Sequence, residues 1–448
     1  MRFPLALITL VSALGAPVVA APHAAQHGFV SPTSSGFVDT SNGFVDVEHI
    51  HAVLADENDP VEAMLLINPS MAKELAEPRL LQLFNGKDAE GETKWMTEGD
   101  KMGLRRQGID WIDLTGRDSL VSPTFDARPN LPDISHQTQV RKVFPHLSET
   151  NMFEMLEVFT SYYNRVYTSE SGVKSQRWLF DEITDIVRKA PPTCRLSIEQ
   201  FPHAFPQNSI IARFSPSGKR NTSQPVTIIS AHLDSVNFWF PLLDAPGADD
   251  NGSGSATILE AFRALVNVGF EPEHGPVEFH WTAGEEAGLL GALDIAEEYL
   301  SRGVRVNGVL NVDETAFVKA NSTPAINLIE VGATEKLNKW VYKLAREYAD
   351  VDVKLSGMIG RGLDHQAWTK HGYPAVSIVE GDQAKGGWLP FPHTVMDRTT
   401  IPPSIGEFSY EHMKQFAKVA VAFAIEQAGS VDHAWRPSRP LPTSTGKP

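Results

Sequence analysis

Strands and helices alternate across the last two thirds of the chain, and this alternation restricts the fold more than any other feature. Apolar runs such as 226–231 (VTIISA), 276–282 (PVEFHWT) and 305–312 are separated by amphipathic stretches such as 285–301. A helix between two strands returns the chain to the same end of the sheet, so the strands become parallel. The sequence therefore predicts an α/β protein, a three-layer sandwich with a mainly parallel central sheet flanked by helices.

The same periodicity places the other elements of the sandwich. Two amphipathic helices come first, at 149–167 and 174–189. The other expected strands are 194–201, 209–214, 325–331, 351–355 and 374–380, and the other expected helices are 253–267, 334–349, 364–371 and 406–427.

The first twenty residues have the layout of a secretory signal peptide. Arg2 gives a positive start, residues 3–14 form a short apolar run, and small residues lead up to a cleavage point after Ala20. The run is shorter than the roughly 20 apolar residues that span a bilayer. We therefore expect a secreted, extracellular protein with no membrane partner.

The next hundred residues differ from the predicted sandwich in composition and in hydrophobic periodicity. Residues 21–60 are rich in Ser, His, Gly and Asp and predict a poorly ordered spacer, whereas 61–115 regain a pattern. The apolar residues with helical spacing are Met64, Leu65, Leu80 and Leu81.

A loop rich in Pro and Asp, roughly 116–135, predicts a boundary and a cleavable linker. The expected division is a signal peptide at 1–20, an N-terminal segment at 21–129, a catalytic domain at 130–428 and a Pro/Ser/Thr-rich tail at 429–448.

Composition excludes several kinds of protein. With 39 basic and 55 acidic residues the formal charge is −16, which argues against a nucleic-acid partner, since such proteins carry a basic face. The one cysteine, Cys194, excludes an intrachain disulfide framework and a cysteine-rich zinc site. We expect a monomer.

Polar residues follow the apolar runs at the point where ligands bind in open α/β sheets. The chemistry-bearing residues at these places are His232 and Asp234, Asp249 and Asp250, Glu285 and Glu286, Asp313, and His393 on a later loop. Each has a structural explanation on its own, such as a turn or a helix start. Imidazole and carboxylate without thiolate suit zinc, and Mn or Co less selectively. A two-metal site needs a bridging carboxylate, which Asp249 or Asp250 could supply.

The adjacent pair Glu285 and Glu286 suggests a division of labour. Neighbouring residues at a helix start point about 100° apart, so both do not easily bind the same ion. One would be a ligand, and the other a general base for a water whose pKa zinc lowers towards ~7.

Five motifs, in order, resemble the secreted co-catalytic dizinc leucine aminopeptidases of fungi and bacteria. They are AHLDS (231–235), PGADDNGSG (246–254), TAGEEAGLLG (282–291), LNVDETAF (310–317) and FPHTVMD (391–397). The stretch from Lys94 to Asp110 resembles the prosegment of the fungal enzymes. The resemblance implies a metallo-aminopeptidase that removes N-terminal residues, Leu among them, and that acts on peptides with a free N-terminus. Residues 21–129 would then act as an intramolecular inhibitor or folding aid.

The resemblance also implies roles residue by residue. His232 and Asp313 would bind one zinc ion, and Glu286 and His393 the other. Asp249 would bridge the two ions, with a cis peptide bond between Asp249 and Asp250. The catalytic residues would be Glu285, which activates a zinc-bound water as general base, and Asp234, which orients His232.

The chain departs from the family pattern around the substrate pocket. The matching loop, 359–368, contains no cysteine, and Gly360 stands where the family has a pocket Tyr. Glu314 stands where Met often follows the ligand Asp. His365 is a rival to His393 as metal ligand. Trp239 and Phe240, in the long loop between His232 and Asp249, are candidates for the pocket wall.

Other functions remain open at this point. The same scaffold could serve a dizinc carboxypeptidase or a glutaminyl cyclase-like reaction, or a secreted binding protein without catalysis. Asn221 and Asn321 lie in glycosylation sequences.

Overall fold

A computed structural model describes residues 37–40, 43–84, 91–117, 129, 131–217, 224–356 and 362–431 of the chain. The predicted signal peptide, Asn221, Gly360 and all but the first residues of the predicted tail lie outside these ranges. Among the described residues no helix combines the length and the apolar character needed to span a membrane.

An eight-stranded sheet forms the centre of the molecule, with the strand order β13-β12-β14-β10-β8-β9-β7-β6. Its strands are β6 (Leu196–Phe201), β7 (Ser209–Phe214), β8 (Val226–His232), β9 (Val277–Thr282), β10 (Val306–Val312), β12 (Ala325–Ile329), β13 (Asp352–Ser356) and β14 (Ala375–Val379). The run β14-β10-β8-β9 is parallel, whereas β6, β7 and β12 join antiparallel neighbours. The predicted mainly parallel sheet is therefore confirmed.

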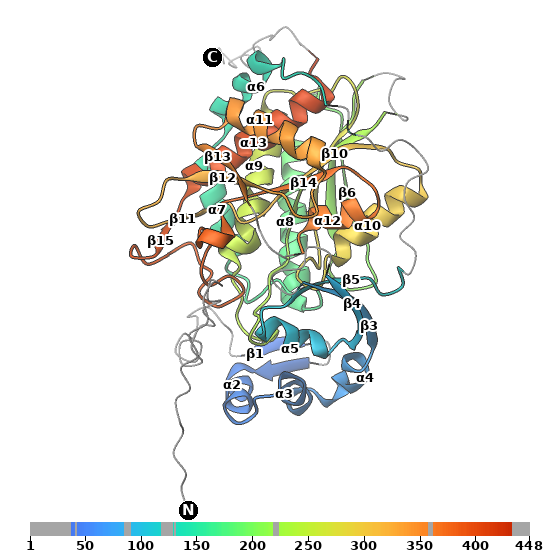
Figure 1. The fold of residues 1–448 in the computed structure, drawn as a ribbon, viewed down its shortest axis with the longest axis vertical. Coiled ribbons are helices and arrows are strands. Elements are labelled where there is room, and N and C mark those ends of the chain that lie inside the picture. The colour runs from blue at the N-terminus through green and yellow to red at the C-terminus, as the bar shows by residue number, and fades with distance from the viewer. Residues whose placement is uncertain are drawn as a thin grey trace, which may run out of the picture.

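Helices cover both faces of this sheet (Figure 1). One face packs on α6 (Gln137–Val143), α7 (Glu149–Phe159), α8 (Glu170–Arg188), α9 (Gly254–Asn267), α11 (Glu335–Tyr348) and α13 (Tyr410–Ala428). The other face packs on α10 (Leu290–Ser301) and α12 (Asp364–Lys370). A two-stranded sheet of β11 (Phe317–Lys319) and β15 (Gly406–Phe408) lies apart from the central one.

The central strands β8, β9 and β10 are buried along their whole length, because helices cover both of their faces. In β8, Ile229 faces the larger helical layer and Ile228 the layer of α10 and α12, and both are fully buried. Ser148, Ser169 and Ser409 cap the helices α7, α8 and α13, each accepting a hydrogen bond from a first-turn N–H group. The cap of α7 lies where the sequence predicts the helix start, but α7 ends at Phe159 instead of 167, and α8 and α13 begin at Glu170 and Tyr410 instead of 174 and 406.

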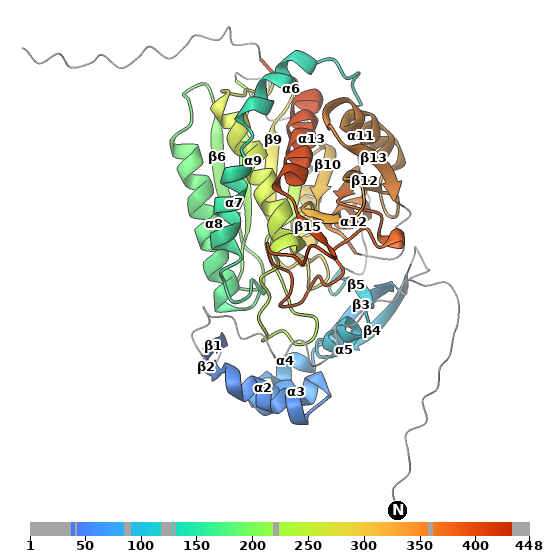
Figure 2. The ribbon, with the colours of Figure 1, turned by 90° about the vertical axis from the view of Figure 1, so that its left-hand side faces the viewer.

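Residues 37–40, 43–84 and 91–117 form a smaller N-terminal unit, which lies below the carboxyl ends of the central strands in both views (Figures 1 and 2). After the hairpin β1 (Phe37–Thr40) and β2 (Gly43–Asp46), its elements are α2 (Val47–Asp56), α3 (Pro60–Ile67), α4 (Ala72–Leu75), β3 (Pro78–Phe84), β4 (Glu92–Thr97), α5 (Asp100–Arg106) and β5 (Asp110–Asp113). The three strands form an antiparallel sheet in the order β4-β3-β5.

Three sequence predictions are wrong in detail. Residues 37–56 form a hairpin and a helix, although 21–60 predicted a spacer, because Ile50 and Leu54 pack into a cluster with later residues. Leu80 and Leu81 belong to β3, since pairing with strands on both sides overrides the helical spacing. The helix predicted from 285 begins at Leu290, because residues 284–289 form a turn with positive φ at Gly284, Gly288 and Leu289.

Candidate metal centre

Polar side chains from five segments meet at the carboxyl ends of the parallel strands. His232 ends β8, Asp313 follows β10, and Glu285 and Glu286 lie in the turn after β9. Asp250 comes from the irregular turn η3 (Ala248–Ser253) that leads into α9. The carboxyl ends of parallel strands share one sheet edge, so these residues converge although they are far apart in sequence. A loop between β14 and β15 adds His393.

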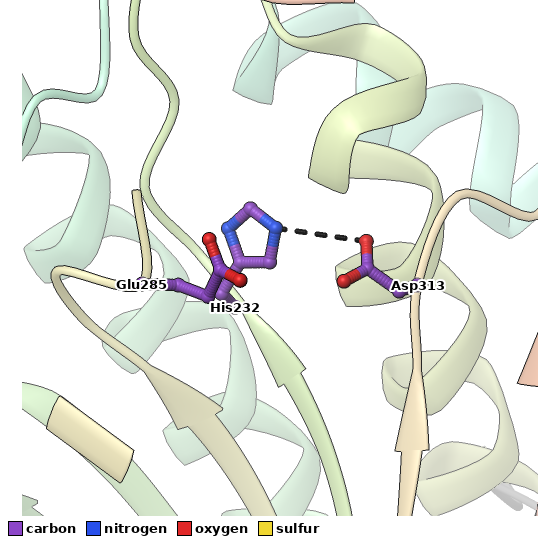
Figure 3. Close-up of side chains that lie close together, drawn as sticks. All are labelled: His232, Glu285 and Asp313. Carbon is purple, nitrogen blue, oxygen red and sulfur yellow. Dashed lines mark ion pairs between the residues drawn. The ribbon is translucent and has the colours of Figure 1, made fainter. Parts of the chain in front are cut away.

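The side chains form two groups, each able to hold a cation. His232, Glu285 and Asp313 make the first group, and within it one nitrogen or oxygen of each residue lies within 4.8 Å of the others (Figure 3). Asp250, Glu286 and His393 make the second group by the same measure. The set contains six of the residues that the sequence singled out.

Asp250 lies between the two groups. Its Oδ1 is 3.1 Å from His232 Nε2, and its Oδ2 is 2.5 Å from His393 Nε2. His232 Nε2 also lies 3.6 Å from Asp313 Oδ1, and His393 Nε2 lies 3.4 Å from Glu286 Oε2. One carboxylate thus faces a histidine of each group.

The prediction that Asp249 bridges the site is wrong. The fully buried Asp249 turns away, and its Oδ1 accepts a hydrogen bond of 3.0 Å from the N–H group of Ala316. The backbone at Asp250 is extended (φ −103°, ψ 99°), and in extended chain successive side chains point to opposite sides. The non-proline cis peptide bond is also one residue later than predicted, between Asp250 and Asn251.

Asp397 holds the backbone of both aspartates. Its Oδ1 accepts a hydrogen bond of 2.8 Å from the N–H group of Asp249, and its Oδ2 accepts one of 3.0 Å from the N–H group of Asp250. Asp397 ends the FPHTVMD motif, but no role was predicted for it. Its place four residues after His393 was the available signal.

Asp234 contacts both the histidine and the glutamate turn. Its two carboxylate oxygens accept hydrogen bonds of 3.1 and 3.2 Å from the N–H groups of Glu285 and Glu286. Asp234 Oδ1 also lies 3.5 Å from His232 Nδ1. The carboxylate therefore ties the end of β8 to the turn after β9.

Arg165 is buried and binds the loop around the site, a role that was not predicted from the sequence. The guanidinium of Arg165 donates hydrogen bonds to the carbonyl oxygens of Leu233, Pro246 and Gly247. Burial lowers the pKa of Arg165 to about 10, although nearby carboxylates, Asp397 first, favour its charge. The local sequence does not reveal this role, because the three carbonyl groups that the guanidinium binds are at least 68 residues away.

The electrostatics of the site fit a cation. Burial, with help from neighbouring carboxylates, raises the pKa of Glu285 and of Glu286 well above the usual range. Burial also disfavours charge on Asp250, yet His393 and His232 hold the pKa of Asp250 well below its usual range. Glu286 Oε1 is buried and has no hydrogen-bond partner among the described residues. Imidazole and carboxylate donors without thiolate are those of zinc, so the residues present fit this ion.

The rival histidine does not reach the site. His365 is fully buried in α12, and its Nε2 lies 2.9 Å from the carbonyl oxygen of Val331. Burial lowers the pKa of His365 to about 4, which keeps the ring neutral. The metal groups contain His393 instead.

A pocket opens onto the two groups. Besides the six residues of the groups, its wall contains Asp110, Trp111, Phe238, Gly288, Leu289, Glu314, Gly362 and Leu363. Phe238 stacks on His393 with 3.6 Å between the ring centres. The prediction that Trp239 and Phe240 line the pocket is wrong, because both pack instead against the N-terminal unit.

Comparison with known proteins agrees with this geometry. Residues 209–415 match peptidase family M28. The chain is 34% identical over 365 residues to leucine aminopeptidase 1 of Neurospora crassa, which covers 79% of this chain and 87% of that protein. It is 31% identical to leucine aminopeptidase 1 of Paracoccidioides brasiliensis, over 81% of this chain and 92% of that protein.

Solved structures share the fold. The LapA aminopeptidase of Legionella pneumophila superimposes with a TM-score of 0.67 at 23% identity, over 79% of this chain and 99% of that one. LapB from the same organism gives a TM-score of 0.61 at 21% identity, over 79% of this chain and 100% of that one.

Proposed function

The chain belongs to peptidase family M28 and is a zinc-dependent aminopeptidase, and we propose that it uses two zinc ions and Glu285 as general base to release N-terminal residues from peptides. Apolar residues such as leucine are the first substrates to test, because the fungal relatives are named leucine aminopeptidases. The observation that carries the proposal is the pair of donor groups joined by Asp250.

The residues divide naturally between two ions. His232, Asp313 and one oxygen of Asp250 would hold the first, and Glu286, His393 and the other oxygen of Asp250 would hold the second. Bound zinc lowers the pKa of water towards ~7 and polarises a carbonyl group. A carboxylate binds a metal ion in its charged form. The positive charge of the bound ions would offset the cost of burying these negative charges.

Glu285 would move the proton of the reaction. It stands in the first donor group with His232 and Asp313, while its neighbour Glu286 belongs to the second group. Its carboxylate would accept a proton from the attacking water and donate it to the leaving amine of the peptide. Burial raises the pKa of the Glu285 carboxyl above its usual range, which makes the carboxylate a stronger base for taking up that proton.

Asp234 would hold the general base and the metal ligands in their relative positions. Its carboxylate holds the N–H groups of Glu285 and Glu286 and lies beside His232. It would thus fix the base and a ligand of each ion at once, as the partners behind metal ligands commonly do.

A comparison of free and blocked substrates tests the activity. We expect hydrolysis of leucine p-nitroanilide, loss of hydrolysis when its amino group is acetylated, inhibition by a chelator, and recovery with two equivalents of zinc. Cleavage of a peptide blocked at its N-terminus would favour a carboxypeptidase, and cyclisation of N-terminal glutamine would favour a cyclase. Inactive protein that contains zinc would favour a binding protein.

We propose further that residues 21–129 are a prosegment that covers the active site until it is removed. Support comes from Asp110 and Trp111 of β5, which lie in the wall of the pocket. The N–H group of Asp113 donates a hydrogen bond of 3.0 Å to the carbonyl oxygen of Gly288, so β5 is tied to the catalytic turn. This position of β5 would narrow the access of a peptide to the two donor groups.

Export is part of the same proposal. Residues 1–20 would direct secretion, and the mature protein would be a monomer. Asn321 is exposed and lies in an Asn-Ser-Thr sequence, so it is available for a glycan. Mass spectrometry of the secreted protein would test the cleavage points and the glycan together.

A further inference from the structure

Three side chains outside the two metal groups form a continuous chain of hydrogen bonds from α10 to β7. The central one is His203, which lies in the loop between β6 and β7 and whose side chain is fully buried. Its Nδ1 lies 2.7 Å from Asp294 Oδ2 of α10, and its Nε2 lies 2.7 Å from the Oγ atom of Ser209, the first residue of β7. A carboxylate only accepts hydrogen bonds, so Nδ1 carries the proton and Nε2 accepts a hydrogen bond from the hydroxyl group of Ser209.

The chain ends on the backbone of Ala283, at the start of the turn that carries Glu285. The Oγ atom of Ser209 accepts a hydrogen bond of 3.0 Å from the N–H group of Ala283, which directly follows β9. Ser209 and Ala283 are both fully buried, so after loss of the hydroxyl group no solvent water would replace it as acceptor. The hydroxyl group therefore fixes the place where the backbone leaves the sheet, two residues before Glu285.

The ring of Phe205 joins His203 to the same turn by a second route. The two rings are stacked, with 4.6 Å between their centres and 11° between their planes. A Cβ atom added at Gly284 would lie 3.1 Å from Phe205 Cζ, so this ring packs closely against the turn. His203 thus contacts two side chains, and each of them holds one of the two residues that precede Glu285.

The turn 284–289 depends on such contacts for its position. It contains three residues with positive φ and belongs to no helix or strand, so no regular hydrogen-bond ladder fixes it. Asp234 holds the N–H group of Glu285, whereas Ser209 and Phe205 hold the residues before it. The position of a reacting group matters, since a displacement of about 1 Å can cost about 10²-fold in rate.

We propose that His203 is a positioning residue for the aminopeptidase reaction. By orienting the hydroxyl group of Ser209 and packing on Phe205, it holds the turn where Glu285 reaches the attacking water. The proposal rests on the proposed function of Glu285 as general base. Partners that orient the groups of a metal site commonly change activity by about 10–100-fold, which sets the size of the expected effect.

Kinetics of the processed enzyme test this role. The full chain is folded, loaded with zinc and then processed by protease, and kcat and KM are measured with leucine p-nitroanilide. We expect kcat to fall at least about tenfold in Ser209→Ala and in His203→Ala. The KM and the zinc content should stay close to those of the wild type, because the proposed ligands and the pocket wall are untouched. His203→Gln should recover part of the kcat, since its amide oxygen can accept the hydrogen bond from Ser209.

Glu297→Gln is the matched control. Glu297 lies on α10 three residues after Asp294, and both carboxylates contact Arg117, but Glu297 is exposed and it is Asp294 that bonds His203. This variant should keep the kcat of the wild type. Wild-type kcat in both alanine variants overturns the proposal, and so does a fall in kcat that Glu297→Gln shares.

Hydrogen–deuterium exchange of residues 282–289 gives a second measurement, which does not depend on activity. The backbone amides of this segment should exchange faster in Ser209→Ala and His203→Ala than in the wild type, and at the wild-type rate in Glu297→Gln. A lower kcat with unchanged exchange would show that the turn has kept its place, and this result overturns the proposal.

Two further outcomes are also decisive. If the alanine variants do not fold, His203→Gln is compared with His203→Asn, which is too short to reach the hydroxyl group of Ser209, and equal kcat and exchange in the two overturn the proposal. Wild type that hydrolyses no aminoacyl substrate refutes the aminopeptidase function instead. The exchange rates then still decide whether His203 holds the turn.

Discussion

The guanidinium of Arg105 donates a hydrogen bond of 2.5 Å to the carbonyl oxygen of Glu286, so the N-terminal unit holds the backbone of a candidate metal ligand. The same guanidinium lies over the rings of Trp111 and Phe238, with 5.1 and 5.8 Å to their centres. Lys101 of the same helix donates a second hydrogen bond, to the carbonyl oxygen of Ala287.

Arg105→Ala should release part of the inhibition in the uncleaved chain. A buried hydrogen bond from a charged donor contributes about 1.5–3 kcal/mol, which corresponds to a more than tenfold weaker hold on the turn. We expect initial rates on leucine p-nitroanilide to rise about tenfold, with intact mass confirmed before and after the assay. Lys94→Ala, an exposed cation on β4, is the control and should not change the rate. Equal activity of uncleaved and trimmed wild type would contradict the inhibitory role altogether.

Glu285→Gln should abolish turnover without loss of metal. A general base contributes about 10²–10⁴-fold, so kcat should fall by roughly that factor. Zinc content, measured by plasma mass spectrometry, should match the wild type, because Gln keeps the size of the side chain and the proposed ligands are untouched. Glu286→Gln is the matched comparison and should lower zinc content. Wild-type kcat in Glu285→Gln would remove Glu285 from the reaction.

Asp250→Asn and Asp249→Asn should differ although the two residues are neighbours. Asp250 faces both histidines, so its amide variant should bind zinc at least tenfold more weakly in competition with a chelator. Asp249 faces away, and an Asn side chain can still accept the hydrogen bond from Ala316, so that variant should keep two ions. The reverse ranking would restore Asp249 as the bridge.

Arg165→Met should destabilise the folded protein strongly. The change removes the guanidinium donor from three buried carbonyl oxygens, of which Gly247 keeps the N–H group of Gly252, and it removes a buried cation from a group of carboxylates. Loss of one partner from such an arrangement costs about 3–5 kcal/mol of unfolding free energy, which denaturant titration can measure. Arg188→Gln, at an exposed helix end, should change it by less than about 0.5 kcal/mol.

Acid should weaken the fold through His412. Burial lowers the pKa of His412 to about 4, against roughly 6.5 in the unfolded chain. Above pH 6.5 the His412 ring is neutral in both the folded and the unfolded chain, and its contribution to the free energy of unfolding is fully present. As the pH falls from 6.5 to 4 the unfolded chain binds a proton that the folded chain does not, so stability is lost, by an amount on the order of 3 kcal/mol.

His412→Gln should reduce this loss, because Gln can still donate to the carbonyl oxygen of Ala325 but does not titrate. The slope of unfolding free energy against pH should become shallower by about one proton between pH 4 and 6.5. His146→Gln changes an exposed histidine and serves as the control. An unaltered slope in His412→Gln would show that other groups govern the acid transition.

The fold and most of the site follow from local signals in the sequence. Continuous apolar runs that end in a polar residue gave β8, β9 and β10 and, directly after them, His232, the glutamate pair and Asp313. These signals are informative because burial on both faces favours apolar residues along a strand, although Glu278, His280 and Asn311 are polar residues buried within β9 and β10.

The missing parts depend on contacts between distant residues. Asp249 and Asp250 are identical in type, and the backbone of both is held by Asp397, which lies 147 residues beyond Asp250. Arg165 and β3 are similar cases, since one is defined by carbonyl groups of a remote loop and the other by the strands on either side. Periodicity within a segment carries no information about such partners.

The burial of α13 has a consequence for how the protein is made. This helix is the last regular element of the described chain, it is buried along nearly all of its length, and it packs against α7, α9 and α11. The helix follows α7, α9 and α11 in the sequence, so the larger helical layer cannot close before residues 410–428 have been synthesised. The N-terminal unit is made before α13 and is available throughout that interval, whereas a chain truncated before Tyr410 would expose the apolar surface that α13 covers.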